Sequence, residues 1–203
     1  MIAVRKKYIY TAIAIILLAI IIIGCIFLRE KILKYRYPVH YREYVELYSD
    51  EYDVPEEIIF AIILVESGFD KNAKSHADAH GLMQILPSTY EWLSELMGES
   101  FNADDITEPE SNIKHGVFYL SFLYDMFGNW DTTIASYNAG QGKVSNWLSD
   151  TRFSDDGETL KDIPGDETRN YVKKVKKAAK IYVMLYYEKN NDSKERQGQY
   201  EYR

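Results

Sequence analysis

The sequence has little cysteine, proline or glycine for its length. One cysteine, Cys25, among 203 residues excludes a disulfide framework and any zinc site built from several cysteines. Five prolines and eleven glycines are too few for a collagenous or low-complexity chain, and a hydrophobic fraction of 46% argues against intrinsic disorder. Sustained alternation of apolar and polar residues is also lacking, so strands are not expected. These absences predict a folded, all-α protein.

The formal net charge of -7 is the sum of two segments of opposite sign. Residues 1–36 hold seven of the 24 basic residues and one of the 31 acidic ones, which leaves 17 basic and 30 acidic residues for the rest of the chain. An acidic main domain argues against nucleic acid as a partner.

The N-terminal segment contains a long uncharged run. Residues 8–28 are 21 positions dominated by Ile, Ala and Leu, between two basic clusters. At 1.5 Å per residue the run is about 31 Å long as a helix, enough for a hydrocarbon core of roughly 30 Å. We expect residues 1–38 to form a membrane anchor with a transmembrane helix at about 8–28 and a basic juxtamembrane segment. A cleaved signal peptide usually has a shorter apolar region that ends in a small-residue cleavage site, neither of which is seen.

A second interpretation of the anchor concerns Cys25. Residues 22–25 resemble a bacterial lipoprotein processing site, at which Cys25 would carry the lipid. The apolar run continues past this cysteine to Leu28, which favours an uncleaved spanning helix. Basic residues on both sides leave the orientation open on charge alone.

Residues 39–189 are expected to form one helical domain, and residues 190–203 a polar C-terminal tail. Capping residues, apolar periodicity and glycine punctuation predict six helices. These open or lie at Asp53 (running to Val65), Ser88 (to Gly98), Thr107 (to Gly128), Asp131 (to Gly140), Val144–Leu148 and Asp166 (to Leu185). A polar loop is expected over residues 149–165, and loops of that length are often functional.

The first of these helices carries a candidate acid. Residues 58–65 are almost entirely apolar, so this helix is expected to be buried, and Glu66 follows at its C-terminal end. Apolar surroundings and the negative pole of the helix both favour a neutral carboxyl group. These conditions would make Glu66 a proton donor at neutral pH, although an arbitrary glutamate at this place is more often simply the first solvated residue.

Four short blocks follow one another with ordered spacing. They are Glu66-Ser67, Gly81-Leu82-Met83-Gln84, Tyr137-Asn138-Ala139-Gly140, and Glu167-Thr168 with Tyr171. With these blocks, residues 39–187 resemble the soluble-type lytic transglycosylase (SLT) family, relatives of goose-type lysozyme that cleave bacterial peptidoglycan. The resemblance implies a compact lysozyme-like helical domain with a substrate cleft.

The resemblance also implies a mechanism with one catalytic residue. Glu66 would protonate the β-1,4 glycosidic oxygen between N-acetylmuramic acid and N-acetylglucosamine, then accept a proton from the muramoyl C6 hydroxyl, which leaves a 1,6-anhydromuramoyl end. Most glycosidases need a second carboxylate; Asp70 and Asp78 are the nearest in sequence and are interpreted as solvated turn residues. A lysozyme-like muramidase and a non-catalytic peptidoglycan-binding scaffold remain alternatives.

Seven residues inside the blocks are expected to contact or shape the substrate site, and each also has a structural interpretation such as capping or packing. They are Ser67, Met83, Gln84, Tyr137, Asn138, Glu167 and Tyr171. The two tyrosines are expected to stack on sugar rings, and the two amides to bind acetamido or hydroxyl groups.

No metal or cofactor is expected, because the four histidines show no metal-ligand spacing. The lysines between residues 173 and 180 are interpreted as a solvated helix face. We expect a single-pass protein of the bacterial cell membrane with its catalytic domain outside the cytoplasm, bound to peptidoglycan glycan strands. Such a location would also suit an unidentified partner in cell-wall or secretion machinery.

Overall fold

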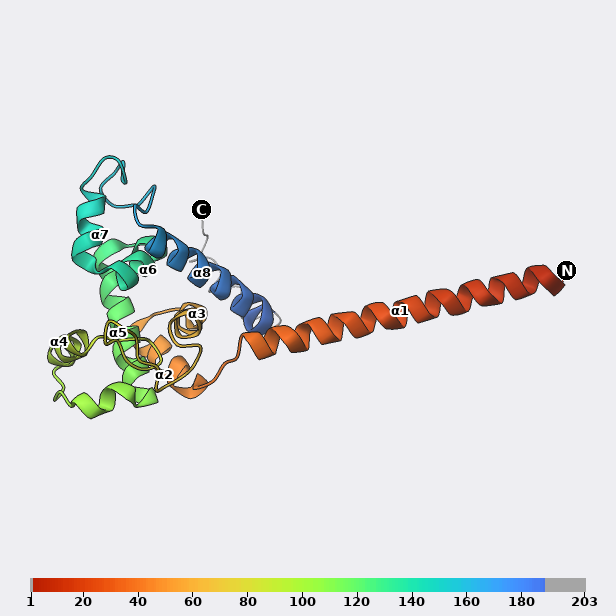
Figure 1. Ribbon diagram of the computed structural model, residues 1–203, viewed down its shortest axis with the longest axis horizontal. Coiled ribbons are helices and arrows are strands. Elements are labelled where there is room, and N and C mark those ends of the chain that lie inside the picture. Colours follow the sequence, from red (N-terminus) through yellow and green to blue (C-terminus); the bar gives the residue numbers. More distant parts are fainter. Residues whose placement is uncertain (1, 189–203) are drawn as a thin grey trace. The chain divides into compact units, whose positions relative to one another are not determined.

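A computed structural model describes residues 2–188, and the chain divides into two compact units that meet between Pro38 and Val39. Figure 1 shows the order of the elements. They are α1 (Ile2–Arg36), α2 (Arg42–Tyr52), α3 (Glu56–Glu66), α4 (Pro87–Met97), the 3-10 helix η1 (Ala103–Thr107), α5 (Pro109–Phe127), α6 (Trp130–Ala139), α7 (Gln141–Leu148), α8 (Asp166–Tyr182) and the π-helical η2 (Val183–Tyr187). The expected all-α fold is confirmed.

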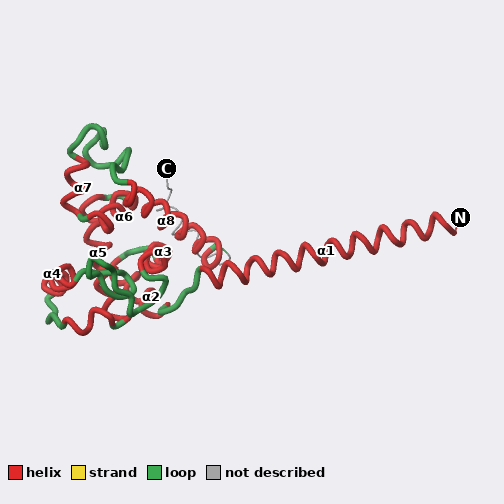
Figure 2. The backbone as a smooth tube through the Cα atoms, in the orientation of Figure 1, coloured by secondary structure: helices red, strands yellow, loops and turns green. Residues whose placement is uncertain are grey.

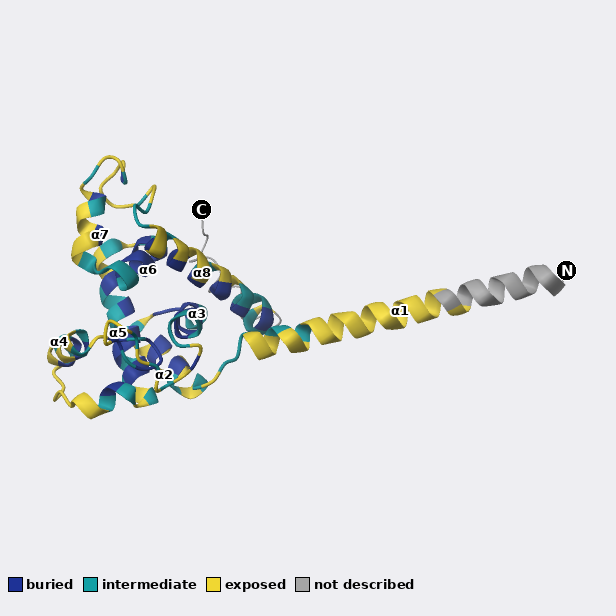
Figure 3. Ribbon diagram, viewed as in Figure 1, coloured by how far each residue is buried: buried dark blue, intermediate teal, exposed yellow. Residues whose placement is uncertain are grey.

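The first unit consists of α1 and the residues that follow it up to Pro38. Side chains of α1 are described at Ile13 and from Ile15 onward, and the large apolar ones up to Leu28 are 48–69% exposed (Figure 3). Among the residues that the structure describes, we find no helix with the length and apolarity of a membrane span. The span predicted for residues 8–28 falls partly on side chains outside that description, and the structure does not confirm it.

The second unit is built around pairs of packed helices. Helix α3 packs on α8, α5 packs on α2 and α6, and α6 also contacts α7 and α8. Loops join the helices, and the described residues contain isolated bridges but no strand (Figure 2). Helix α3 is the most deeply buried, since the side chains of residues 58–63 have no exposed surface (Figure 3). The apolar residues 58–63 therefore form the centre of the core of this unit.

The start of this domain differs from the prediction. Helix α2 was not expected, and Asp53, predicted to open the next helix, instead caps the C-terminus of α2. Its φ of 53° places it in the left-handed region, and its N–H donates to the carbonyl of Ser49. Helix α3 then begins at Glu56 after Pro55. Aspartate tolerates left-handed backbone better than most residues, so the same residue type serves at either helix end.

Other predicted helix starts are displaced by one to three residues. Proline is the first residue of both α4 and α5. Pro87 lies one residue before the predicted cap Ser88, and Pro109 lies two residues after the predicted cap Thr107. For α6 the cap is Asn129 and not Asp131, since the Asn129 Oδ1 accepts a 2.8 Å hydrogen bond from the N–H of Thr132. The predicted ends at Gly98, Gly128 and Gly140 are confirmed.

The last elements agree with the sequence more closely. Helix α8 begins at Asp166 as predicted and passes at Tyr182 into the π-helical turn η2. Residues 149–165 contain turns and bends without a helix, and the Asp156 carboxylate accepts hydrogen bonds from the backbone N–H groups of Glu158 and Thr159, 2.8 Å each. The tail predicted for residues 190–203 lies outside the described residues.

Candidate active site

Glu66 is the last residue of α3, where the buried helix ends. The residues before it up to Ile63 are fully buried, whereas Glu66 itself keeps part of its surface in solvent. Burial raises the pKa of its carboxyl group from 4.5 to about 7, and a hydrogen bond from Tyr171 acts in the opposite direction. The group therefore exchanges its proton near neutral pH, as the sequence predicts for an acid in apolar surroundings.

Helix α8 brings Tyr171 to this carboxyl group. The Tyr171 hydroxyl donates a 2.6 Å hydrogen bond to Oε1 of Glu66, and the ring is only 8% exposed. Burial, followed by the nearby Glu66 charge, holds the pKa of Tyr171 well above its usual value. The expected role of Tyr171 was to stack on a sugar; its observed contact is with the carboxyl group itself.

The loop that contains residues 81–84 is fixed by side chains of α5 and α6 and by Ser67, the residue that follows α3. Tyr137 of α6 donates a 2.9 Å hydrogen bond to the Met83 carbonyl, and Ser67 Oγ lies 2.8 Å from the Leu82 carbonyl. Ser67 Oγ also lies 3.1 Å from the Ile63 carbonyl at the end of α3. The hydroxyl group of Ser67 thus bonds backbone carbonyls next to Glu66, which fits the capping interpretation of this residue.

The third contact of this loop comes from α5. Asn112 is fully buried, and its Oδ1 accepts a 2.7 Å hydrogen bond from the Met83 N–H. Its Nδ2 donates to the carbonyls of His80 (3.1 Å) and Ile106 (2.6 Å). Gly81 has a φ of +78°, and a Cβ there would lie 2.4 Å from the Asn112 Nδ2. The glycine is therefore required both by its backbone conformation and by the approach of this amide.

Two predicted contact residues in the loop have structural roles. The Met83 side chain is fully buried against Gly116, so it lies in the core instead of on an exposed wall. Gln84 has a φ of 51°, and its Nε2 donates to the carbonyls of Ala73 (3.0 Å) and Gly81 (2.9 Å). The nitrogen of this amide therefore closes the loop.

Asn138 and Glu167 lie at the junction of α6 and α8. The Asn138 Oδ1 accepts a 2.8 Å hydrogen bond from Thr168 Oγ1, and Thr168 is buried. Glu167 is exposed in the first turn of α8, where a negative charge favours the helix N-terminus. Thr168, and not the predicted residue Glu167 beside it, makes the hydrogen bond that holds Asn138.

Comparison with known proteins decides the family. The family described as "Transglycosylase SLT domain" matches residues 43–160, more than half of the chain. The chain belongs to the transglycosylase SLT domain family.

Relatives and solved structures of this SLT family agree. The chain is 35% identical over 148 residues to the soluble lytic murein transglycosylase of Escherichia coli K12, and this covers 70% of the chain and 23% of that protein. It is 32% identical over 169 residues to the membrane-bound lytic murein transglycosylase C of Edwardsiella ictaluri, covering 70% and 46%. The structure of an inactive Glu-to-Gln mutant of lytic transglycosylase Slt from Pseudomonas aeruginosa aligns with a TM-score of 0.67 and 37% identity, covering 75% of this chain and 25% of that one. The chain thus spans about a quarter to a half of the lengths of these relatives.

Sequence reasoning missed two residues of this SLT site. Asn112 gave a weak signal, as a polar residue beside the apolar face of α5, and Thr168 gave a stronger one, because it lies inside a family block. Both act through long-range hydrogen bonds to backbone or side-chain groups that are distant in sequence.

The two other carboxylates considered from sequence are solvated turn residues, as predicted. Asp70 is exposed, and its Oδ1 accepts a 2.9 Å hydrogen bond from the Asn72 N–H. Asp78 is exposed and pairs with Lys74 at 2.6 Å. Within the described part of the chain, no three His, Cys, Asp or Glu side chains gather where they could hold a metal ion.

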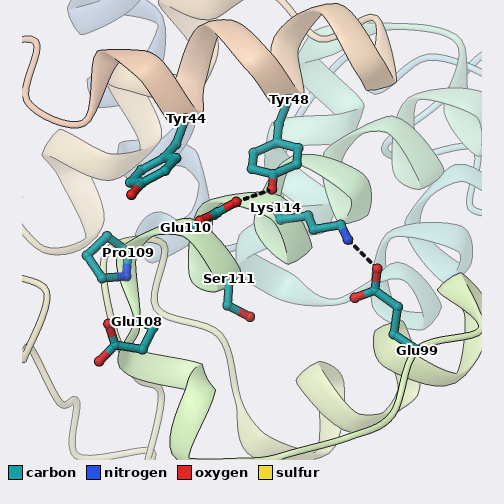
Figure 4. A pocket seen from close by; sticks show the side chains of 8 residues that line it. All are labelled: Tyr44, Tyr48, Glu99, Glu108, Pro109, Glu110, Ser111 and Lys114. Atoms are coloured by element: carbon teal, nitrogen blue, oxygen red, sulfur yellow. Dashed lines mark hydrogen bonds and ion pairs between the residues drawn. The ribbon is translucent and has the colours of Figure 1, made fainter.

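A hollow of about 420 Å³ lies elsewhere on the SLT domain (Figure 4). It is lined by residues of α2, the first turns of α5 and the segment after α4, and contains none of the predicted site residues. The Tyr48 hydroxyl donates to Glu110 at 3.2 Å, and Lys114 pairs with Glu99. Because these polar groups satisfy one another, the titrating carboxyl group of Glu66 remains the better centre for chemistry.

Proposed function

We propose that the protein is a peptidoglycan lytic transglycosylase that cleaves the β-1,4 bond between N-acetylmuramic acid and N-acetylglucosamine and leaves 1,6-anhydromuramoyl ends. The observation that carries the proposal is Glu66, a carboxyl group with a pKa of about 7 at the end of a buried helix and hydrogen-bonded to Tyr171. Membership of the SLT family and relatives named lytic murein transglycosylases support it.

In the proposed reaction Glu66 acts first as an acid and then as a base. Its proton passes to the glycosidic oxygen while the bond from that oxygen to the muramoyl anomeric carbon breaks. The muramoyl C6 oxygen then bonds to the anomeric carbon, and the proton of the C6 hydroxyl returns to Glu66. No water is consumed, and a group that must both give and take a proton works best with a pKa close to the operating pH.

The positions of the other carboxylates support a reaction with one catalytic carboxylate. Hydrolysis by the usual routes needs a second, positioned carboxylate as nucleophile or as base for water. Asp70 and Asp78, the neighbours in sequence, are exposed and held in turns of the loop. The family resemblance implies that the acetamido group of the substrate stabilises the positive charge that develops on the sugar ring.

Substrate recognition is proposed to rest on hydrogen bonds and ring contacts. The amide groups of Gln84 and Asn138 offer an acceptor or donors to acetamido and hydroxyl groups, and Tyr137 offers part of a ring face. For Met83, Ser67, Tyr171 and Glu167 we propose supporting roles. The first two shape the loop and the end of α3, Tyr171 holds the carboxyl group, and Glu167 favours the start of α8.

We further propose a single-pass anchor in the bacterial cell membrane, with the SLT domain on the outer side, where peptidoglycan lies. The uncharged run over residues 8–28 and the exposed apolar side chains on α1 support an anchor. A membrane-bound relative from Edwardsiella ictaluri is consistent with this location. Separating membranes from soluble extract and blotting for the protein, before and after a high-salt wash, tests the anchor.

Digestion of purified sacculi tests the activity. Wild type is expected to release muropeptides that are lighter by one water than hydrolysis products, and Glu66→Gln to release fewer by about 100-fold or more. Glu91→Gln, a change at an exposed glutamate on α4, serves as the matched control and is expected to retain activity. Reducing ends in place of anhydro ends would identify a muramidase. No release by wild type, with sacculus binding intact, would indicate a scaffold.

A further inference from the structure

Four aromatic rings from three helices form a continuous row. Trp92 of α4 lies edge-on to Phe122 of α5, with ring centroids 5.2 Å apart, and edge-on to Tyr119 of α5 at 6.0 Å. Tyr119 in turn lies 5.4 Å from Tyr137 of α6. All four residues are only partly buried, so this aromatic row (Trp92, Tyr119, Phe122 and Tyr137) has surface in contact with solvent.

One end of the aromatic row belongs to the proposed active site. The Tyr137 hydroxyl donates to the Met83 carbonyl, and the charge of Glu66 acts on that hydroxyl. The other rings lie progressively further along α5 and across to α4, elements that contact each other in the second unit. The row therefore leads from the acid toward α4.

Tyr119 carries an unused polar group in this row. Burial alone raises the pKa of its hydroxyl, and among the described residues the structure gives that hydroxyl no hydrogen-bond partner. The hydroxyl is not one of the fully buried side-chain atoms that lack a partner in the described residues, so it reaches the surface, where a ligand group can bond it. Tyrosine at a ligand site combines a ring face with such a polar tip.

We propose that Trp92, Tyr119 and Phe122 bind a sugar residue of the glycan strand at a distance from the bond that is cleaved. The proposal rests on the proposed function and extends it to the length of glycan that the enzyme requires. Sugar rings present C–H faces that pack on aromatic rings, and their hydroxyl and acetamido groups can bond the Tyr119 hydroxyl. An uncharged strand also suits this row, which contains no ionisable carboxylate or ammonium group.

Binding by a non-cleaving form of the full chain tests the proposal. The Glu66→Gln protein is titrated with N-acetylglucosamine oligomers of two to six units, and its Kd is expected to fall as the oligomer lengthens. Adding Trp92→Ala is expected to weaken binding of the longest oligomer by ~10-fold and to remove the length dependence. Adding Tyr119→Phe, which removes only the hydroxyl, is expected to weaken it by ~3-fold.

Phe101→Ala is the matched control, because Phe101 is an exposed ring that contacts Tyr90 outside the row. It is expected to leave Kd unchanged. If Trp92→Ala lowers the thermal midpoint strongly, Trp92→Leu and Tyr119→Phe decide instead. The proposal is overturned if the Trp92 and Tyr119 variants have the same Kd and the same length dependence as the Glu66→Gln parent. It is also overturned if the parent binds oligomers of every length with the same Kd.

Failure of the proposed function gives a different result. If wild type releases no anhydro muropeptides while length-dependent binding through Trp92 persists, the row is a glycan site on a protein of another activity. If wild type releases them and Trp92 has no effect on binding, the lytic activity stands and this site is wrong.

Discussion

The hydroxyl of Tyr171 donates a 2.6 Å hydrogen bond to Oε1 of Glu66, and the two residues are 105 positions apart in the sequence. A hydrogen bond of this kind favours the ionised carboxylate, whereas burial of Glu66 favours the neutral acid. Burial is the larger effect, so the pKa of Glu66 is raised, and the Tyr171 hydroxyl limits the size of that rise. The packing of α8 on α3 therefore sets the pH range in which Glu66 can exchange a proton.

Tyr171→Phe is expected to raise the pKa of Glu66 further above its present value of about 7, because the opposing hydrogen bond is removed. The acid form then persists to higher pH, and the alkaline limb of the rate profile moves upward by roughly one unit. Measuring kcat/KM from pH 5 to 9 on soluble glycan fragments checks this. Tyr44→Phe, at the hollow of Figure 4, removes a hydroxyl elsewhere and should leave the profile in place. An unmoved alkaline limb in Tyr171→Phe would contradict the assigned role.

The raised pKa of Glu66 also predicts how stability depends on pH. A carboxyl group that binds its proton more tightly in the folded state stabilises that state fully below the unfolded pKa near 4.5, and this contribution is lost as the pH rises through about 7. Glu66→Gln stays neutral throughout. Relative to wild type it is therefore expected to gain stability between pH 5 and 8, by about 2–3 kcal/mol.

Urea unfolding at pH 5 and at pH 8 measures this difference. Glu91→Gln provides the exposed control and should shift little between the two conditions. If the stability difference between Glu66→Gln and wild type is the same at both pH values, burial does not raise the pKa of this carboxyl group in the folded state.

The centre of the fold could be predicted because it rests on local composition. The apolar run before Glu66 is long enough to define a buried helix and to place a carboxyl group at its end. Helix α2 was missed because it has few apolar positions to show a helical period. Asp53 was assigned to the wrong helix end because aspartate suits both ends. Local patterns give the element but not always its boundary.

The supports of the site could not be predicted from local patterns. The bond between Asn112 and the Met83 N–H joins residues 29 positions apart, and it depends on how α5 packs against the loop. The chain of rings from Trp92 to Tyr137 likewise arises from three separate helices. Such contacts are produced by tertiary packing, and the local pattern of one sequence carries little information about that packing.

Asn112 predicts a large loss of stability on substitution. Asn112→Ala removes three hydrogen bonds and leaves the Met83 N–H and the Ile106 carbonyl without the partner that they have here. The His80 carbonyl keeps its hydrogen bond from the Ile85 N–H. The expected cost is about 2–4 kcal/mol. Gly81→Ala should cost a similar amount, since its Cβ would meet the Asn112 amide in a left-handed conformation.

Thermal or urea unfolding checks both changes. Asn146→Ala, at an exposed position on α7, is the matched control and is expected to change stability by less than about 0.5 kcal/mol. A loss in Asn112→Ala as small as in this control would mean that water replaces the amide in the loop.

Thr168 separates positioning of Asn138 from packing. Its hydroxyl donates a 2.8 Å hydrogen bond to the Asn138 Oδ1, which fixes the amide with its nitrogen free to bind a substrate oxygen. Thr168→Val keeps the buried volume and loses the donor, so KM for glycan fragments is expected to rise about 3- to 10-fold with a smaller change in kcat. Thr168→Ser retains the hydroxyl and should behave like wild type in KM, although it loses a methyl group from a buried position. If the valine and serine variants gave the same KM, the hydroxyl would have no part in binding. Asn138 would then be held by the packing of α6 on α8 alone.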